Sequence, residues 1–389
     1  MSAVLSACTR ESDWLLPFLR EFVAHESPST DRAPLDACGR WLAGELARLG
    51  AAVERLAGAP TADHVLARWP GQGVRVLLVG HFDTVWPVGQ IARMPIAERD
   101  GRLFGPGVLD MKAGLSIGIL AARVVAGLTA ESARPRLSLL ATSDEEVGSA
   151  TSRSAIERLA RQHDAVLVLE PALPGGAVKT ARKGVGEFEV IAHGVSSHAG
   201  ANPGEGASAV REIARQILAI DALNDPARGV SVNVGVIDGG TRSNVVAERA
   251  RAIVDVRIAR AEDAAAVEQV MRTLVPADAR VRLEVRGGIN RPPMVRTEGV
   301  ARLYQLARDV AAEQGRDLAE GATGGASDGN FTAAIGVPTL DGLGALGDGP
   351  HALHEHVVIN ELAPRAALLA GLILRLGDNG IGIAPQRRP

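Results

Sequence analysis

The sequence has few cysteines, no excess of charge of one sign and no long hydrophobic run. Cys8 and Cys38 are the only cysteines in 389 residues, too few for a disulfide framework and without the paired spacing of a structural zinc site. Lysine and arginine together number 42, against 45 acidic residues, so no global positive field exists to hold nucleic acid or an anionic membrane. A small or locally recognised ligand fits this balance better.

Membrane and export signals are also missing from the sequence. No uninterrupted apolar stretch approaches the roughly 20 residues that span a bilayer. The segment 1–10 has no basic start and no apolar run long enough for a secretory signal, and residues 5–8 only faintly resemble a lipoprotein cleavage box. We expect a cytoplasmic protein.

The hydrophobic pattern predicts an α/β fold. With 46% hydrophobic residues the chain is able to bury a large core, and its length suggests two domains or one domain with an insertion. Short runs rich in Val, Leu and Ile alternate with segments of helical period, which favours strands buried on both faces. Strands are expected at 74–80, 136–142, 165–169 and 337–341. Helices are expected at 36–49, 113–128, 152–161, 299–314 and 363–376.

A different pattern occupies the middle of the chain, between residues 185 and 286. It comprises a strand, a helix (208–220), two strands (230–237 and 251–257), a helix (262–274) and a strand (281–285). This βαββαβ order is that of a ferredoxin-like unit. We therefore predict a first domain formed by residues 1–183 and 291–389, and an inserted domain at 184–290. The two connections between them are expected at 182–186 and 287–293.

Residues that carry chemistry follow three predicted strands of the first domain. His81 and Asp83 follow one strand, the acidic residues 144–146 follow the next, and Glu170 follows the third. In an open parallel sheet, ligands bind beyond the carboxyl ends of the strands. Each group alone is a weak signal, because an acidic pair is usually a solvated loop and a His-x-Asp pair is more often a local hydrogen bond. Their coincidence indicates a metal site.

The spacing of these residues suggests different roles. His81 and Asp83 are two apart and point to the same side of an extended segment, so Asp83 is placed to orient the His81 ring. Glu145 and Glu146 are adjacent and point apart if the backbone is extended, so one is expected to bind metal while the other handles protons. Asp110 lies where a glycine-rich loop meets a helix, and taken alone it reads as a helix N-cap.

Together with later residues, these motifs resemble a known family. They are His81-x-Asp83, Gly107-x-x-Asp110-x-Lys112-x-Gly114, Asp144-Glu145-Glu146-x-Gly148, Glu170-Pro171 and Gly349-Pro350-His351-x-x-x-Glu355. In this order, and with the inserted βαββαβ unit, the chain resembles the M20 metallopeptidases over nearly its whole length, most closely the glutamate carboxypeptidase branch. The resemblance implies a zinc-peptidase-like catalytic domain with a mostly parallel central sheet. The inserted unit would be a lid and dimerisation domain.

The resemblance also implies two zinc ions per subunit, although cobalt and manganese accept the same nitrogen and oxygen ligands. His81 and Glu170 would hold one ion and Glu146 and His351 the other. Asp110 would bridge the two ions, and with a shared water each ion approaches the four-coordinate geometry that zinc favours. His354 is the alternative to His351, which we prefer because an acidic residue follows it four places later.

Catalytic roles follow from the same resemblance. Glu145 would be the general base, Asp83 the support of His81, and a cis peptide would follow Asp110. The two ions would lower the pKa of their shared water towards roughly 7, and Glu145 would take its proton and deliver it to the leaving amine. His198 would stabilise the oxyanion from the neighbouring subunit of a homodimer; without the family it reads as a turn residue on a lid.

Two places are candidates for binding a substrate carboxylate, and a third residue is a candidate for contacting the substrate. Arg291 is the first choice, because a planar guanidinium at a connection between domains binds a carboxylate bidentately. Gly325, in the glycine-rich segment 324–329, would offer a backbone N–H group to an anion. Asn244 matches a lid position used for substrate. Arg257 is more typical of ion pairing on a strand.

The sequence therefore predicts a di-metal hydrolase that cleaves the amide bond of N-acyl or peptidyl amino acids with a free C-terminal carboxylate, with glutamate as the leaving residue by analogy. An N-acyl amino acid deacylase or desuccinylase would share the ligands and differ in its pocket. A general aminopeptidase would need an acidic group for the substrate amine. A non-catalytic dimeric metal-binding protein is disfavoured, because Glu145 and all five inferred ligands are present together. The expected partners are a small-molecule substrate and a second subunit, without nucleic acid or membrane.

Overall fold

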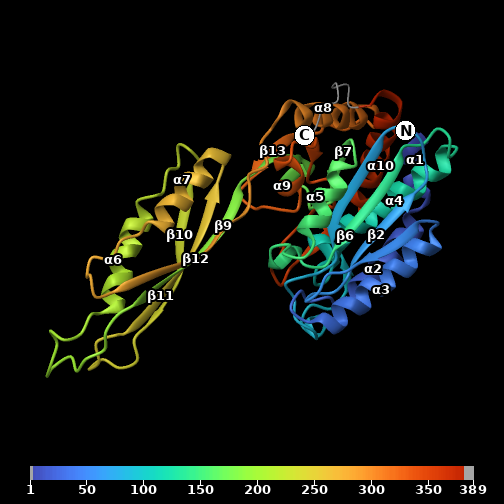
Figure 1. The fold of residues 1–389 in the computed structure, drawn as a ribbon. Coiled ribbons are helices and arrows are strands. Elements are labelled where there is room, and N and C mark those ends of the chain that lie inside the picture. The colour runs from blue at the N-terminus through green and yellow to red at the C-terminus, as the bar shows by residue number, and fades with distance from the viewer. Residues whose placement is uncertain (1–2, 381–389) are drawn as a thin grey trace. The chain divides into compact units, whose positions relative to one another are not determined.

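The computed structural model describes residues 3–380, and Figure 1 shows its ribbon. Contacts between residues divide the described chain into two compact units. Unit 1 comprises the chain up to Ala181, Arg296–Ala322 and the chain from Ser327, and unit 2 comprises Arg182–Val295 and Thr323–Ala326. The sequence predicts the boundaries between the two domains after residues 183 and 290, and it does not predict that the short segment 323–326 belongs to unit 2.

Unit 1 is an α/β sandwich in which helices cover both faces of a central sheet. Its helices are α1 (Ala3–Arg10), α2 (Ser12–Ala24), α3 (Arg32–Arg48), α4 (Ala113–Leu128), α5 (Arg153–Arg161), α8 (Glu298–Glu313), α9 (Gly329–Ala334) and α10 (Ile359–Asn379). Its strands are β1 (Ala52–Leu56), β2 (His64–Trp69), β3 (Arg75–His81), β4 (Ala97–Arg99), β5 (Arg102–Phe104), β6 (Arg136–Thr142), β7 (Ala165–Val168), β14 (Thr339–Leu340), β15 (Gly347–Asp348) and β16 (His356–Val358). Strands β8 (Val178–Arg182) and β13 (Glu320–Thr323) pair with each other and end at unit 2. Short helical turns are η1 (Gln90–Ala92), η2 (Val108–Lys112), η3 (Glu145–Val147) and η4 (Pro174–Gly176).

The central sheet of unit 1 has the order β1-β2-β6-β3-β7-β14. Strands β6, β3, β7 and β14 run parallel, and β1 and β2 are antiparallel additions at one edge. Alternate residues of β3 face opposite cores: Leu78 packs in the core with α2, α3, α4 and α10, and Leu77 packs in the core with α5 and α9. The sheet is thus buried on both faces, as its continuous apolar strands predict.

Helix α4 lies at the centre of the larger core and begins beside the ends of the parallel strands (Figure 1). A Cβ on Gly114 would lie 1.9 Å from the carbonyl oxygen of Leu169, so glycine is required for this close approach. The stretch Val108–Leu128 is long and apolar enough in average composition to cross a membrane, although Asp110, Lys112 and Arg123 interrupt it, and 78% of its apolar 18-residue window is buried inside the protein. That burial is typical of a core helix.

Two helices begin earlier than the apolar pattern predicts. Helix α3 starts at Arg32, where Asp31 caps it by accepting a hydrogen bond from the backbone N–H of Ala33 at 3.2 Å. Proline is tolerated in a first helical turn, so Pro34 does not delay the start. Helix α10 starts at Ile359 and includes Pro364.

Unit 2 is the predicted βαββαβ unit. Its elements are β9 (Gly184–His193), α6 (Ala209–Asp221), β10 (Ser231–Gly239), β11 (Arg249–Ile258), α7 (Ala261–Arg272) and β12 (Arg282–Arg291). They form an antiparallel sheet of order β10-β11-β9-β12, whose apolar face packs against the two helices. Strand β12 continues to Arg291 with an irregularity after Ile289, so most of the predicted connection 287–293 is strand.

Candidate metal centre

The carboxyl ends of β3, β6 and β7 meet at one edge of the central sheet, because these strands are parallel neighbours. His81 is the last residue of β3, the turn η3 follows β6, and Glu170 lies two residues beyond β7. Short backbone segments therefore carry the acidic side chains directly from rigid strands to this edge. Such an edge is where open α/β sheets bind ligands.

Asp110 lies between two histidines. Its Oδ1 is 3.2 Å from Nε2 of His81, and its Oδ2 is 3.4 Å from Nε2 of His351. Each histidine also lies close to a different glutamate. Oε1 of Glu170 is 3.7 Å from Nε2 of His81, and Oε2 of Glu146 is 3.2 Å from Nε2 of His351. One carboxylate therefore faces two separate imidazole and carboxylate pairs, which is the arrangement that a bridging ligand requires.

Groups of ligand atoms in this cluster are close enough to share an ion. Ligand atoms of His81, Asp110 and Glu146 all lie within 4.8 Å of one another, and the same holds for His81, Glu145 and Glu170. His354 has a different position: its side chain is 64% exposed and its nearest described acidic partner is Asp348, at 4.0 Å. The geometry thus brings His351, not His354, to Asp110.

The backbone of Glu145 and Glu146 is not extended, contrary to the expectation from the sequence. Both residues belong to the 3-10 turn η3, which ends at Gly148 with a left-handed φ of 96°. Glu145 is buried with 8% exposure, and its carboxylate lies in the group of His81 and Glu170. Glu146 turns to His351 instead. The tight turn separates the two carboxylates as effectively as a strand would.

Asp83 fixes both the His81 ring and the η3 turn. The Nδ1 of His81 is 3.0 Å from the backbone carbonyl oxygen of Asp83 and 3.4 Å from its carboxylate, so the ring presents Nε2 to Asp110. The Asp83 carboxylate also accepts hydrogen bonds from the backbone N–H groups of Glu145 and Glu146, both at 3.2 Å, and from the Ser29 hydroxyl at 2.7 Å. The carbonyl is thus the closer ring partner, and the carboxylate mainly holds the turn.

Asp110 is not the N-cap that the sequence alone suggests. Helix α4 begins at Ala113, and Asp110 lies before it in the turn η2 with non-helical φ and ψ of −114° and 93°. The Asp110-Met111 peptide is cis, as the family resemblance implies. Lys112, buried in the same turn, donates hydrogen bonds to the carbonyl oxygens of Phe22 and His25, which close the end of α2.

The concentration of carboxylates changes the titration of both histidines. Burial alone lowers the pKa of His81, but hydrogen bonds to Asp110 and Asp83 raise it well above its usual value. Hydrogen bonds to Asp110 and Glu146 raise the pKa of His351 to about 10. Burial opposes ionisation of Asp110, yet its bonds to the two histidines hold its pKa below the usual range. The cluster of carboxylates therefore stabilises positive charge at this site, whether from protons on the histidines or from metal cations.

The donor set fits metal ions. Oε1 of Glu146 is buried and has no hydrogen-bond partner in the described part of the chain, so an oxygen is left for a cation. Two imidazole nitrogens, a shared carboxylate and two further carboxylates suit zinc, cobalt or manganese.

The predicted residues of unit 2 fall into two places. The backbone N–H of Ala199 donates to the carbonyl oxygen of Asn244 at 3.0 Å, so His198 and Asn244 lie on adjoining loops. Nδ1 of His198 accepts hydrogen bonds from the N–H groups of Gly200 and Ala201, so the ring proton is on Nε2, and the side chain is exposed.

The second place is the end of β12. Arg291 is 8% exposed there. The carbonyl oxygen of Gly325 accepts a hydrogen bond from Arg182, and the Gly325 N–H is directed to Thr323 Oγ1 at 3.4 Å. Arg257 pairs with Asp255 on its own strand, as expected.

Sequence reasoning missed one residue of the centre and the role of another. Nζ of Lys179, on β8, is 3.9 Å from Oε2 of Glu170, and its side chain is 9% exposed. Glu355 was noticed only as a motif residue, but its buried carboxylate holds the Asp110 loop. No local pattern marks Lys179, whereas the four-residue spacing from His351 did point to Glu355.

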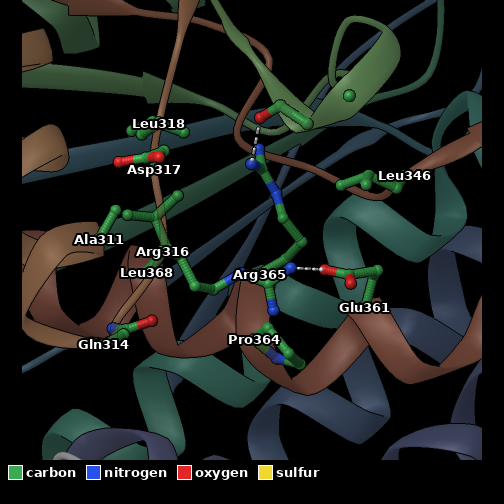
Figure 2. Close-up of a pocket in the computed structure, with 12 residues that line it drawn as sticks. Ala311, Gln314, Arg316, Asp317, Leu318, Leu346, Glu361, Pro364, Arg365 and Leu368 are labelled. Carbon is green, nitrogen blue, oxygen red and sulfur yellow. Dashed lines mark hydrogen bonds and ion pairs between the residues drawn. The ribbon is translucent and has the colours of Figure 1, made fainter.

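A cavity of about 50 Å³ elsewhere in unit 1 is a second place to consider as a functional site (Figure 2). Arg365 lines it, but its guanidinium donates to the carbonyl oxygens of Gly176, Gly342 and Gly344. Arg316, at the same cavity, is paired with Glu361. These cations are already used by the protein, so the cavity does not compete with the metal centre as the functional site.

A parallel sheet that ends in two imidazole and carboxylate pairs around a shared aspartate has the donor set of a metal-dependent hydrolase. The model of the peptidase family M20/M25/M40 matches residues 77–375. The chain belongs to this family and is a metallopeptidase-type hydrolase.

Relatives span the chain almost completely. Carboxypeptidase G2 of Pseudomonas sp. (strain RS-16) is 30% identical, over 97% of this chain and 92% of the relative. Succinyl-diaminopimelate desuccinylase of Verminephrobacter eiseniae (strain EF01-2) is 27% identical, over 89% and 92%. The crystal structure of aminopeptidase PepT from Bacillus cereus ATCC 10987 has a TM-score of 0.76 at 21% identity, covering 94% of this chain and 98% of that one, and shows the shared fold.

Proposed function

We propose that the protein uses two zinc-type ions to hydrolyse the amide bond of N-acyl or peptidyl amino acids with a free C-terminal carboxylate. The observation that carries this proposal is Asp110, whose two oxygens face His81 and His351 separately. His81 and Glu170 would hold one ion, Glu146 and His351 the other, and Asp110 both. Two bound cations would supply a water of lowered pKa and polarise the scissile carbonyl.

Glu145 would move the proton. Its carboxylate lies among the ligand atoms of His81 and Glu170, yet five other side chains suffice to hold two ions. It is therefore placed to accept a proton from the attacking water and to return it to the leaving amine. Asp83 would hold the backbone of Glu145 in place through its hydrogen bond to that residue's N–H.

His198 and the residues proposed to bind the substrate carboxylate lie on unit 2. Because Nδ1 of His198 accepts two backbone hydrogen bonds, its Nε2–H is available to donate to an oxyanion. We assign the substrate carboxylate to Arg291, with Asn244 and Gly325 as further contacts. The similarity to carboxypeptidase G2 favours glutamate as the leaving residue.

We also propose a homodimer that forms through unit 2, which would act as lid and dimerisation domain. Strand β10 is an edge strand, and Val236 and Ile237 on it are 51% and 58% exposed. An exposed apolar edge strand readily pairs with another strand. A second copy of the chain, paired along β10, would cover it and would allow His198 to act on the partner's site.

A desuccinylase is the second candidate, because the relative of that name is 27% identical over most of the chain. The test compares hydrolysis of a glutamate-terminated aryl amide with that of N-acetyl and N-succinyl amino acids, including substrates with a blocked amine. Preference for the glutamate amide supports the proposal, and preference for the succinyl substrate supports the alternative. A requirement for a free amine would contradict both.

Arg291→Gln tests carboxylate recognition. It should raise KM for the glutamate amide more than it lowers kcat, because the guanidinium binds ground state and transition state alike. Arg257→Gln is the matched control, since Arg257 pairs with Asp255 on a strand and should leave both constants unchanged. An unchanged KM in Arg291→Gln would refute the assignment.

A further inference from the structure

Glu355 accepts four hydrogen bonds with one buried carboxylate. Its Oε1 accepts from the backbone N–H groups of Leu109 and Asp110, at 2.9 and 3.1 Å. Its Oε2 accepts from the backbone N–H of Gly107 at 2.9 Å and from the indole N–H of Trp86 at 2.8 Å. The residue is 1% exposed, so nearly all the acceptor capacity of this anion is used inside the protein.

These donors come from separate parts of the metal centre. Residues 107–110 form the loop that carries the shared Asp110. Trp86 lies in the loop that follows His81 and Asp83, and Glu355 itself ends the loop that begins at Gly349 and carries His351. His351 has a left-handed φ of 60°, a backbone conformation that is uncommon for a residue other than glycine. One carboxylate thus connects the loops that supply ligands to both proposed ions.

We propose that Glu355 is a positioning residue that makes the two ion sites depend on each other. This inference rests on the proposed two-metal function. By fixing Asp110 relative to His351, Glu355 sets the separation between the shared ligand and the terminal ligand of one ion. By fixing the same Asp110 loop relative to the loop after His81, it sets the geometry of the other ion as well. Loss of this carboxylate should weaken both ions together.

The chemistry of the contact separates this role from simple packing. Glutamine has the shape of glutamate, but it offers one acceptor oxygen and one NH₂ donor group. In Glu355→Gln the NH₂ group would face two N–H donors in either orientation, so two of the four hydrogen bonds would be lost and replaced by repulsion. A partner that merely fills space would tolerate glutamine.

The experiment titrates the metal-free full-length protein with Co²⁺ alone, by calorimetry and by the visible absorption of bound cobalt. Wild type should bind two ions per chain. Glu355→Gln should lose about tenfold or more in affinity for both ions, the usual effect of removing a residue that orients ligands. Glu146→Gln is the matched control in the same centre, because it removes one terminal ligand and should weaken one ion while the other is retained.

Wild-type affinity for both ions in Glu355→Gln, or weakening of one ion alone, would overturn the inference. If Glu355→Gln does not fold, Glu355→Asp decides, because it keeps the charge but is one methylene too short to reach all four donors. It should also weaken both ions together, and unchanged binding would refute the role. Failure of the wild type to bind two ions would instead contradict the proposed function, so the two failures are distinguishable.

Discussion

Replacing Arg365 with methionine should destabilise unit 1 far more than the same replacement of an exposed arginine at the same cavity. Arg365 extends from α10 and is 4% exposed. It donates to the carbonyl oxygens of Gly344 at 2.8 Å, Gly176 at 2.9 Å and Gly342. Burial lowers its pKa to about 10, so it is still charged at neutral pH. It therefore holds three loop carbonyls that methionine cannot bind.

The magnitude follows from those three carbonyls. Each buried acceptor left without a donor costs about 1–3 kcal/mol. Part of this cost is offset, because methionine does not require a charge to be buried. We expect Arg365→Met to lower the free energy of unfolding by about 3 kcal/mol. The Gly344 N–H also donates to the carbonyl oxygen of Glu170, so the loosened loop adjoins a proposed metal ligand.

Tryptophan fluorescence during urea denaturation measures this effect in unit 1. The four tryptophans, Trp14, Trp41, Trp69 and Trp86, all belong to that unit. Arg316→Met is the control, because Arg316 lines the same cavity but is 43% exposed and pairs with Glu361, so it should cost less than about 1 kcal/mol. Equal losses in the two variants would refute the reasoning.

Two further predictions concern metal binding and the core. Metal binding at pH 8 should release at least one proton per chain, because hydrogen bonds to Asp110 and Glu146 raise the pKa of His351 to about 10 and a metal-bound imidazole must be deprotonated. Affinity for the metal should therefore fall as pH falls. Calorimetry in buffers of different ionisation enthalpy measures the release, and a value near zero contradicts the prediction. Gly114→Ala should unfold at a markedly lower urea concentration than wild type, because the new Cβ would lie 1.9 Å from the carbonyl oxygen of Leu169. Gly127→Ala, in the same helix, is the control: its Cβ would meet no atom within 4 Å, so it should stabilise the protein by roughly 0.5–1 kcal/mol.

The sequence predicts the fold well where one physical pattern dominates. The buried strands and the amphipathic helices follow from periodicity, and the positions of His81 and Glu170 follow from the ends of parallel strands. The early start of α3 was missed, because its first turn is set by the Asp31 cap and not by apolar residues.

The details of the metal centre depend on contacts between distant residues. No local pattern shows that Asp110 faces two histidines, one of which, His351, lies far later in the chain. No local pattern shows the hydrogen bonds of Glu355 either, because their donors lie 245 to 269 positions earlier in the chain. The short 3-10 turn at Glu145 also follows from tertiary contacts with Asp83, which a strand-based argument does not include.

The most direct test of the two-metal hydrolase is metal content per chain, measured on wild type and on Glu145→Ala together with hydrolysis of a glutamate-terminated amide. We predict about two ions in both proteins, because Glu145 is not one of the five proposed ligands. Activity should fall by roughly 10²-fold or more in the variant, the usual effect of removing a general base. One ion or none in the wild type after exposure to zinc would contradict the shared role of Asp110.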